Sequence, residues 1–394
     1  MLEHAFAGIR VLDITTFIAG PYAGSLLANL GAHVTKIEPF TGDASRTLIG
    51  GWQTWNKGKH GLALDLAREE GRQALHRMAA QADIFLENLR TGVLPKLKAD
   101  YQSIRALNPR IIYCSISAYG RTGPLSSKPG FDPLCQARTG IMRAQGGDGA
   151  PVFHRIALCD YATAGLTAWA LALALYHRQR TGQGQYIEAS LLNSGLALQA
   201  ANFFDYRGKQ PQPRVDHPSG VPLGADATHR YYQTRDSWVF IGVRSALEWT
   251  ALCHVIGQEA LARDRRFSPR VNRLRHQAEL TSILEQAFPQ RTTAEWMEEL
   301  AEHGVPAAPV HYSHLMFADP QITHNDLLAR FQSADVGRTT QLANPVKLGA
   351  TPGKEWGPAP AIGQHSEQVL ASYGFSPAEV AELEAKDVVR QREA

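Results

Sequence analysis

The first half of the chain alternates short β-rich runs with segments of helical length. This alternation constrains the fold more than any other feature, because a strand, a helix and a second strand in succession form a parallel pair through a right-handed crossover. Arg10–Ile14 is the first predicted strand, Tyr22–Leu30 the helix after it, and His33–Ile37 the second strand. Pro21 suits the first turn of that helix and Gly31 its end.

The same alternation continues to about residue 191. Further strands are predicted at Leu62–Leu66, Asp83–Asn88, Ile111–Ser117 and Tyr186–Leu191, and further helices at Glu69–Gln81, at Tyr101–Leu107 and in the apolar run after Asp160. Repeated units of this kind predict an α/β fold, with a Rossmann-like large domain built on an open, mostly parallel sheet.

The composition changes near Arg207, where a proline-rich stretch with little periodicity begins. We expect five segments: a large domain over 1–207, a linker over 208–227, a smaller α+β domain over 228–328, a return linker over 329–360, and C-terminal helices over 361–394 that pack back on the large domain. In the smaller domain we predict a strand at Trp238–Val243 and helices at Ala246–Ile256, Val271–Phe288 and Thr293–His303.

The charges of the chain are nearly balanced, with 40 Lys and Arg against 37 Asp and Glu. This balance gives no strong field for nucleic acid, which is therefore not expected as a partner. The cysteines and histidines show no metal-ligand spacing, so neither a metal nor a disulfide framework is predicted. The most apolar run, Tyr161–Tyr176, is short for a membrane span, and the N-terminus lacks the pattern of a signal peptide. We expect a cytoplasmic protein without a membrane partner.

Several common catalytic motifs are absent from the sequence. The loop after the first predicted strand reads Phe17-Ile18-Ala19-Gly20-Pro21, where a dinucleotide-binding fold requires GxGxxG. The chain also has no phosphate-binding GxxxxGK[ST] loop, no HExxH and no GxSxG elbow. We therefore expect no nucleotide redox cofactor, although the sheet itself would suit one.

A series of short motifs runs in order along nearly the whole chain. It includes Gly8–Asp13 with Ala19-Gly20-Pro21, Gly31–Pro39, Asn56–Lys59, Asp83–Asn88, Asn108–Tyr113, Tyr119–Pro124, Asp160–Ala164, Thr181–Gln185 and Gly363–Glu367. This ordered set resembles the class III CoA-transferases, the family of formyl-CoA:oxalate and carnitine CoA-transferases, to which the α-methylacyl-CoA racemases are more distantly related. The resemblance is clearest before residue 200 and after residue 340.

The resemblance implies that Asp160 is a covalent nucleophile. The expected activity is transfer of coenzyme A from an acyl-CoA donor to a small carboxylic acid acceptor. A carboxylate that attacks a thioester forms a mixed anhydride, and the released thiolate then forms an aspartyl-CoA thioester, so one exchange is divided into easier steps. Coenzyme A is then substrate and product, and no metal is needed. From spacing alone, Asp160 also fits an N-cap of the helix that follows it.

Two positions separate this chain from the related racemases. Where those enzymes have a proton-carrying histidine before an aspartate, this chain has Phe131 before Asp132, and phenylalanine carries no proton. Where they have an active-site glutamate early in the smaller domain, this chain has Ser245. A racemase or epimerase remains the alternative function, and a coenzyme A-binding module without catalysis is a second alternative.

The resemblance also implies further site residues. Asp132 takes the position of a substrate-site glutamate, and it fits a turn before Pro133 equally well. Ile18 replaces an active-site glutamine, and its backbone and that of Ala19 would flank the thioester. The family's glycine run is reduced here to Ser219–Gly224. The candidate contacts of coenzyme A are Lys59, Leu64, Asn88, Leu89, Arg90 and Arg121, and each cation among them fits a solvated surface charge equally well.

The family forms interlocked homodimers, in which two chains are threaded like links of a ring. The long linkers predicted here would allow such threading. An interlocked homodimer is therefore expected from the resemblance.

Overall fold

The computed structural model describes residues 3–146, 149–208 and 223–392. The contacts within the chain divide it into two compact units. The first contains residues 1–141, 153–207 and 320–394, and the second contains residues 142–152 and 208–319. Most of the predicted linker over 208–227, including most of Ser219–Gly224, lies outside the described residues.

A seven-stranded sheet forms the centre of the first unit. Its strands are β1 (Arg10–Asp13), β2 (His33–Glu38), β3 (His60–Leu64), β4 (Ile84–Glu87), β5 (Ile112–Ser117), β6 (Tyr186–Ser190) and β13 (Val389–Arg390). The order is β13-β3-β2-β1-β4-β5-β6, with β13 antiparallel and the other strands parallel. Successive strands are added on one side of β1 up to β3 and on the other side from β4 to β6. Ligands bind at this kind of switch point in doubly wound sheets. The predicted α/β fold with a mostly parallel sheet is confirmed.

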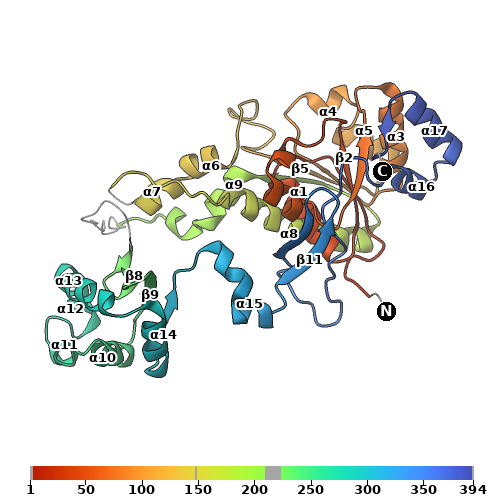
Figure 1. Ribbon diagram of the computed structural model, residues 1–394. Helices are drawn as coiled ribbons and strands as arrows, with labels where there is room; N and C mark the ends of the chain where they lie inside the picture. The colour runs from red at the N-terminus through yellow and green to blue at the C-terminus, as the bar shows by residue number, and fades with distance from the viewer. Residues whose placement is uncertain (1–2, 147–148, 209–222, 393–394) are drawn as a thin grey trace. The chain divides into compact units, whose positions relative to one another are not determined.

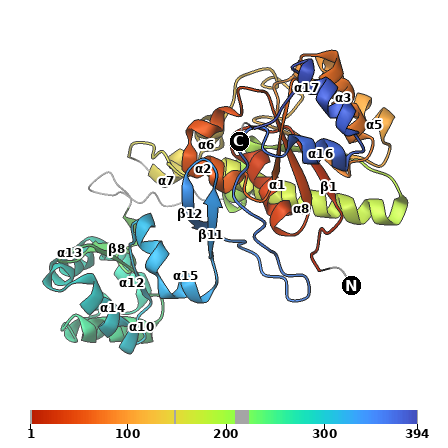
Figure 2. The same ribbon diagram turned by 45° about the vertical axis from the view of Figure 1, so that its right-hand side comes forward.

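Helices cover both faces of this sheet, as Figures 1 and 2 show. One face packs against α3 (Glu69–Ala79), α5 (Tyr101–Leu107), α16 (Ser366–Ser372) and α17 (Pro377–Ala385). The other packs against α1 (Ala19–Asn29), α6 (Asp132–Thr139), α8 (Leu158–Thr181) and α9 (Leu191–Leu198). Successive residues of β1 face opposite sides, so Val11 enters the second core and Leu12 the first.

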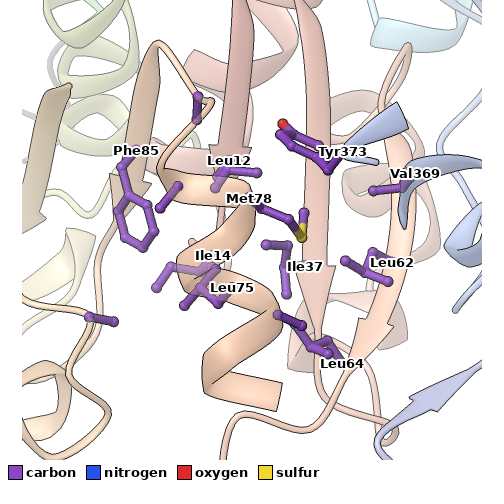
Figure 3. Packing of buried hydrophobic residues seen from close by; sticks show 14 of the residues in the cluster. Leu12, Ile14, Ile37, Leu62, Leu64, Leu75, Met78, Phe85, Val369 and Tyr373 are labelled. Carbon is purple, nitrogen blue, oxygen red and sulfur yellow. The ribbon is translucent and has the colours of Figure 1, made fainter. Parts of the chain in front are cut away.

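The first of these cores joins residues from both ends of the chain (Figure 3). Leu12 of β1 and Met78 of α3 lie in one buried cluster with Val369 and Tyr373 from the C-terminal region. The guanidinium of Arg10 lies 3.7 Å from the centre of the Tyr373 ring, which adds a cation–π contact at the rim. The C-terminal helices are therefore part of the central fold of this unit.

Shorter elements complete the first unit. They are η1 (Ala44–Thr47), α2 (Ile49–Trp55), α4 (Val93–Lys96), η2 (Ala200–Phe203), α15 (Pro320–His324), β11 (Leu328–Ser333) and β12 (Gly337–Leu342), while α7 (Ile141–Gly146) follows α6 at the unit boundary. β11 and β12 pair as an antiparallel hairpin. An irregular linker was predicted over 329–360, and that prediction is wrong for this hairpin, whose strands carry weak alternation and few apolar residues.

Helix α8 presents a row of large apolar side chains to solvent in a single chain. Leu166, Trp169, Leu173 and Tyr176 recur at helical spacing and are 41%, 62%, 49% and 57% exposed. By length and composition, α8 is also the one helix in the described part of the chain that could span a membrane, a test that core helices of soluble proteins pass as well. Its first turn carries Asp160 and its last turn Arg178 and Arg180.

The second unit has its own antiparallel sheet and core. Its strands, in the order β10-β9-β8-β7, are β7 (Gly224–Asp226), β8 (His229–Gln233), β9 (Trp238–Gly242) and β10 (Ala307–Pro309). Its helices are α10 (Ala246–Val255), α11 (Ala260–Arg263), α12 (Arg270–Arg275), α13 (Gln277–Ala287) and α14 (Thr293–Glu302), with η3 (Phe288–Gln290) and η4 (Ser313–Ala318). Ser245 caps α10 in a reciprocal capping box with Glu248. The prediction of a single helix over Val271–Phe288 is wrong, because the helix is interrupted at His276, between α12 and α13.

Three histidines cluster where β2 and β3 begin. The rings of His33 and His60 are stacked at 4.3 Å, and the ring of His365 lies 5.2 Å from that of His60. Burial, with some repulsion from the other two rings, lowers the pKa of His60 to about 4, and burial also lowers the pKa of His33 and His365. The folded chain therefore keeps these rings neutral at pH values where the unfolded chain protonates them.

This cluster predicts acid sensitivity of the fold. The pKa of His60 is lower in the folded than in the unfolded state, so protonation favours the unfolded state. Above about pH 6.5 the ring is neutral in both states, and stability is lost as the pH falls from 6.5 toward 4. At pH 4.5, His60 alone should lower the free energy of unfolding by about 2 to 3 kcal/mol. Urea unfolding of His60→Gln should show a smaller loss between pH 7 and 4.5 than wild type. The exposed His177→Gln is the control, and equal losses in all three proteins would contradict the prediction.

Candidate active site

Asp160 lies in the first turn of α8, but it does not cap that helix. The helix begins at Leu158 and its N-cap is Ala157, whose side chain makes no capping bond. The N–H of Tyr161 already donates to the carbonyl of Ala157, at 3.0 Å. The N-cap interpretation of Asp160 is therefore wrong, and the carboxylate of Asp160 is left for another role.

Asp132 supplies the missing cap from a neighbouring helix. Its Oδ2 accepts hydrogen bonds from the N–H groups of Cys159, at 2.7 Å, and Asp160, at 3.1 Å. Asp132 is the first residue of α6 and is 3% exposed. Its interpretation as a turn residue before Pro133 is wrong, since Pro133 occupies the first turn of a helix, where proline is tolerated. The structure thus brings Asp132 and Asp160 together.

Gln136 fixes the carboxylate of Asp132, and the sequence analysis missed it. Its Nε2 donates to Oδ1 of Asp132 and to the carbonyls of His154 and Ile156, at 3.2 and 3.3 Å. Its Oε1 accepts from the N–H of His154. The segment that leads into α8 is therefore tied to α6 by one buried amide. The signal in the sequence was that Gln136 follows Asp132 by four residues. Residues at this spacing face each other only on a helix, so the signal depends on recognising α6.

The surroundings of Asp160 favour its neutral form more than water does. Burial first, and the nearby charge of Asp132 second, raise the pKa of Asp160 to about 7, while the backbone N–H of Ala19 at the start of α1 opposes the rise. The starts of two helices, α8 and α1, therefore contribute to the electrostatics of this carboxyl group. Burial raises the pKa of the Cys135 and Cys159 thiols to about 12, so neither is a competing nucleophile.

Ile18 and Ala19 lie where the loop from β1 enters α1, and Ala19 influences the pKa of Asp160. Ile18 precedes the first residue of α1 and is half-buried, and Ala19 is buried. Phe17 has a φ of 63°, a left-handed backbone conformation that costs about 1 kcal/mol or more for a bulky residue. Phe131 is the N-cap of α6 and is 58% exposed, directly before Asp132.

Two predicted contacts of coenzyme A are enclosed within the fold. The Nζ of Lys59 donates to Oδ2 of Asp13, the carbonyl of Pro21 and Oδ1 of Asn56, at 2.7, 2.7 and 2.9 Å. All its protons are used, and its side chain is fully buried. Leu64 is 1% exposed in the first core, and its backbone pairs with β13. Neither side chain is accessible to a ligand, so both residues are excluded as candidate ligand contacts.

The other predicted contacts lie on loops beyond β4 and β5. Arg121 donates to both carboxylate oxygens of Glu87, at 2.7 Å each, and to the carbonyl of Leu89, also at 2.7 Å. Its guanidinium therefore orders the loop instead of presenting a free charge. Asn88 exchanges hydrogen bonds with the backbone N–H and carbonyl of Thr16, at 2.8 Å each. Arg90, on the same loop, is exposed.

The described residues contain no group of three or more His, Cys, Asp or Glu side chains that could hold a metal ion. The chemistry available at this site is that of a partly buried carboxyl group, a capping carboxylate and backbone N–H donors. Such donors stabilise the negative charge that develops on a carbonyl oxygen under attack.

Comparison with known proteins gives a consistent match. The model of CoA-transferase family III matches residues 6–366. Succinyl-CoA:glutarate CoA-transferase of Homo sapiens is 31% identical over 98% of this chain and 90% of its own length. Succinyl-CoA–D-citramalate CoA-transferase of Chloroflexus aurantiacus is 32% identical over 97% of this chain and 97% of its own.

Solved structures agree with this match. The crystal structure of a CAIB/BAIF family protein from Brucella suis has a TM-score of 0.84 and 31% identity, and the alignment covers 94% of this chain and all of the other. An orthorhombic crystal form of a Mycobacterium tuberculosis protein has a TM-score of 0.80 and 31% identity over 92% of this chain and 98% of its own.

Proposed function

This chain belongs to CoA-transferase family III, and from that premise we propose that Asp160 is the covalent nucleophile with which it moves coenzyme A from an acyl-CoA thioester to a free carboxylic acid. The observation that carries the proposal is the position of Asp160. Its carboxyl group lies in the first turn of α8, is influenced by the backbone N–H of Ala19, and is held by a helix start that Asp132 caps. A nucleophile needs this combination of fixed position and poor solvation.

The proposed steps conserve the energy of the thioester bond. The Asp160 carboxylate attacks the acyl carbonyl, which gives a mixed anhydride and the CoA thiolate. The thiolate attacks the aspartyl carbonyl, which releases the first acid and leaves an aspartyl-CoA thioester. The acceptor carboxylate then attacks this thioester, and the thiolate finally attacks the new acyl carbonyl and restores Asp160. Each step forms one acyl bond and breaks another, so neither ATP nor a metal takes part.

The names of the relatives suggest the class of substrate. The relatives described above are named for succinyl-CoA as donor and for glutarate or D-citramalate as acceptor. We propose that this enzyme also uses a short acyl-CoA donor and a small di- or hydroxycarboxylic acceptor. The loop of Asn88, Leu89 and Arg90 is the proposed contact of coenzyme A, because it lies at the carboxyl end of β4 with an exposed cation.

Chemical trapping tests the proposal directly. The enzyme is incubated with a panel of acyl-CoAs, succinyl-CoA included, and quenched with hydroxylamine or borohydride. Mass spectrometry should find the peptide of Asp160 modified with productive donors and unmodified with free coenzyme A alone. Absence of modification, with exchange of the α-proton of the acyl group into solvent, would instead identify a racemase. Absence of both signals would favour a binding module.

The exposed apolar row of α8 supports the proposal that the enzyme is a homodimer, interlocked as in its family. A cytoplasmic location is proposed from the sequence alone. Leu166, Trp169, Leu173 and Tyr176 form a continuous apolar face of the kind that another protein surface covers. We expect Trp169→Glu to lower the fraction of dimer that forms on refolding from urea, measured by light scattering, because it places a charge in that face before the chains assemble. The exposed Gln179→Glu on the same helix is the control. A wild type that is monomeric, or a Trp169→Glu variant that refolds to the dimer as fully as wild type, contradicts the expectation.

A further inference from the structure

Two buried lysines hold the two ends of the segment that leads from β1 into α1. The ammonium of Lys36 donates to the carbonyl of Thr15, where the segment starts. The ammonium of Lys59 donates to the carbonyl of Pro21, at 2.7 Å, where the first turn of α1 is formed. Between these two points lie Ile18 and Ala19, and the backbone N–H of Ala19 lowers the pKa of Asp160 against the effect of burial.

Each lysine is itself fixed by a buried carboxylate. Lys59 pairs with Asp13 at 2.7 Å and Lys36 with Asp43 at 3.2 Å, and the four side chains are no more than 1% exposed. Oδ1 of Asp13 also accepts from the N–H and the hydroxyl of Thr15. Burial alone would raise the pKa of Asp13, but the ammonium groups of Lys59 and Lys36 lower it below its usual value. The four groups therefore form one compact, neutral charge cluster beneath the segment.

The packing around this cluster leaves little room for movement. A Cβ atom at Gly24 of α1 would lie 2.9 Å from Oδ2 of Asp13 and 3.2 Å from Nζ of Lys59. A Cβ atom at Gly20 would lie 2.4 Å from the side chain of Thr15. Helix α1 thus passes so close to the ion pair that only glycine fits. In addition, Asn88 binds both backbone groups of Thr16.

We propose that Lys36 and Lys59 are positioning residues of the active site: through the carbonyls of Thr15 and Pro21 they hold the segment 15–21 in place, and with it the N–H of Ala19 near Asp160. The inference rests on the proposed function for its catalytic meaning, but its structural content does not. A buried charge pair gives little net stability compared with apolar residues of similar size, so retaining two such pairs beneath one loop is better explained by their placing of that loop.

Paired substitutions test this inference without leaving an unpaired buried charge. Lys36→Met with Asp43→Asn releases the carbonyl of Thr15, and Lys59→Met with Asp13→Asn releases that of Pro21. The control is Lys57→Met with Glu355→Gln, which removes a pair of 3.1 Å whose ammonium binds the carbonyl of Leu342 instead of the segment. The readout is the pKa of Asp160, measured from labelled aspartate carboxyl carbons by NMR, with Asp160→Asn for assignment.

The segment variants should raise the pKa of Asp160 by about half a unit or more, because the N–H that favours its carboxylate is no longer aligned. Their kcat should fall about tenfold, with the KM for the acyl-CoA nearly unchanged and the acid limb of kcat/KM moved to higher pH. The control pair should leave the pKa in place.

An unchanged pKa of Asp160 in a folded segment variant would overturn the inference. If both pairs fail to fold, Asn88→Ala, which releases only Thr16, is the second test with the same readout and the same deciding outcome. Failure of the trapping experiment on wild type would refute the nucleophile, whereas the pKa measurement would still decide whether the lysines place the N–H of Ala19.

Discussion

Asp160→Asn should lower the rate of coenzyme A transfer by at least about a thousandfold while the protein stays folded, since loss of a covalent nucleophile typically costs that much or more. The amide of asparagine has nearly the shape of the carboxyl group, so the packing around it should be kept. It cannot form the mixed anhydride, so no step of the proposed sequence can begin. The steady-state rate and the trapped peptide are the two measurements.

The same substitution should make the protein more stable above neutral pH. The pKa of Asp160 is raised in the folded state, from 3.8 to about 7, so the folded chain binds the proton more tightly and loses stability as the pH rises through that window. At pH 8 the ionised carboxyl group therefore opposes folding by up to about 4 kcal/mol. Thermal unfolding at pH 8 should give a higher Tm for Asp160→Asn, with a smaller difference at pH 5. An active variant, or one of lower stability at pH 8, would contradict the assignment.

Asp132→Asn should move the acid limb of the pH profile of kcat/KM to lower pH. The wild type needs Asp160 as a carboxylate and should lose activity as the pH falls through about 7. The charge of Asp132 is the second cause of that raised pKa, so its removal should lower the pKa of Asp160. The variant should therefore retain a larger fraction of its maximal activity at pH 6 than wild type does.

At pH 8 the same variant should be about tenfold to a hundredfold less active. In the wild type, one carboxylate oxygen of Asp132 accepts from Gln136 and the other caps Cys159 and Asp160. Asparagine has a single side-chain oxygen and cannot do both, so the start of α8 is held less firmly. Asp100→Asn is a matched control, since Asp100 caps α5 through the N–H groups of Gln102 and Ser103. An acid limb that does not move in Asp132→Asn would show that Asp160 does not sense its charge.

Local sequence predicted most elements of the first unit. The helix Tyr101–Leu107 and the strands around β1 to β6 lie where alternation and glycine or proline signals placed them. These signals are local, and the packed core reinforces them. The break at His276 and the hairpin of β11 and β12 were missed because the same residue types also occur in a continuous helix or in a loop.

The candidate site was predicted less completely, because its contacts link distant parts of the chain. The resemblance pointed to Asp160 and Asp132, but only the structure shows that one caps the helix of the other. A lysine in a loop has the same appearance in the sequence whether it faces solvent or a buried carboxylate. Lys59 was therefore predicted as a contact of coenzyme A, since nothing in the sequence indicates its pairing with Asp13.

The first core also has a consequence for how the protein is made. Its early residues, such as Leu12, lie in one cluster with Val369, Tyr373 and Val389, which are synthesised much later. On the ribosome, this part of the nascent core stays incomplete and the edge of β3 stays unpaired until those residues emerge. The chain should therefore depend on chaperones during synthesis, and removal of the short strand β13 should reduce the yield of native protein far more than its small size suggests.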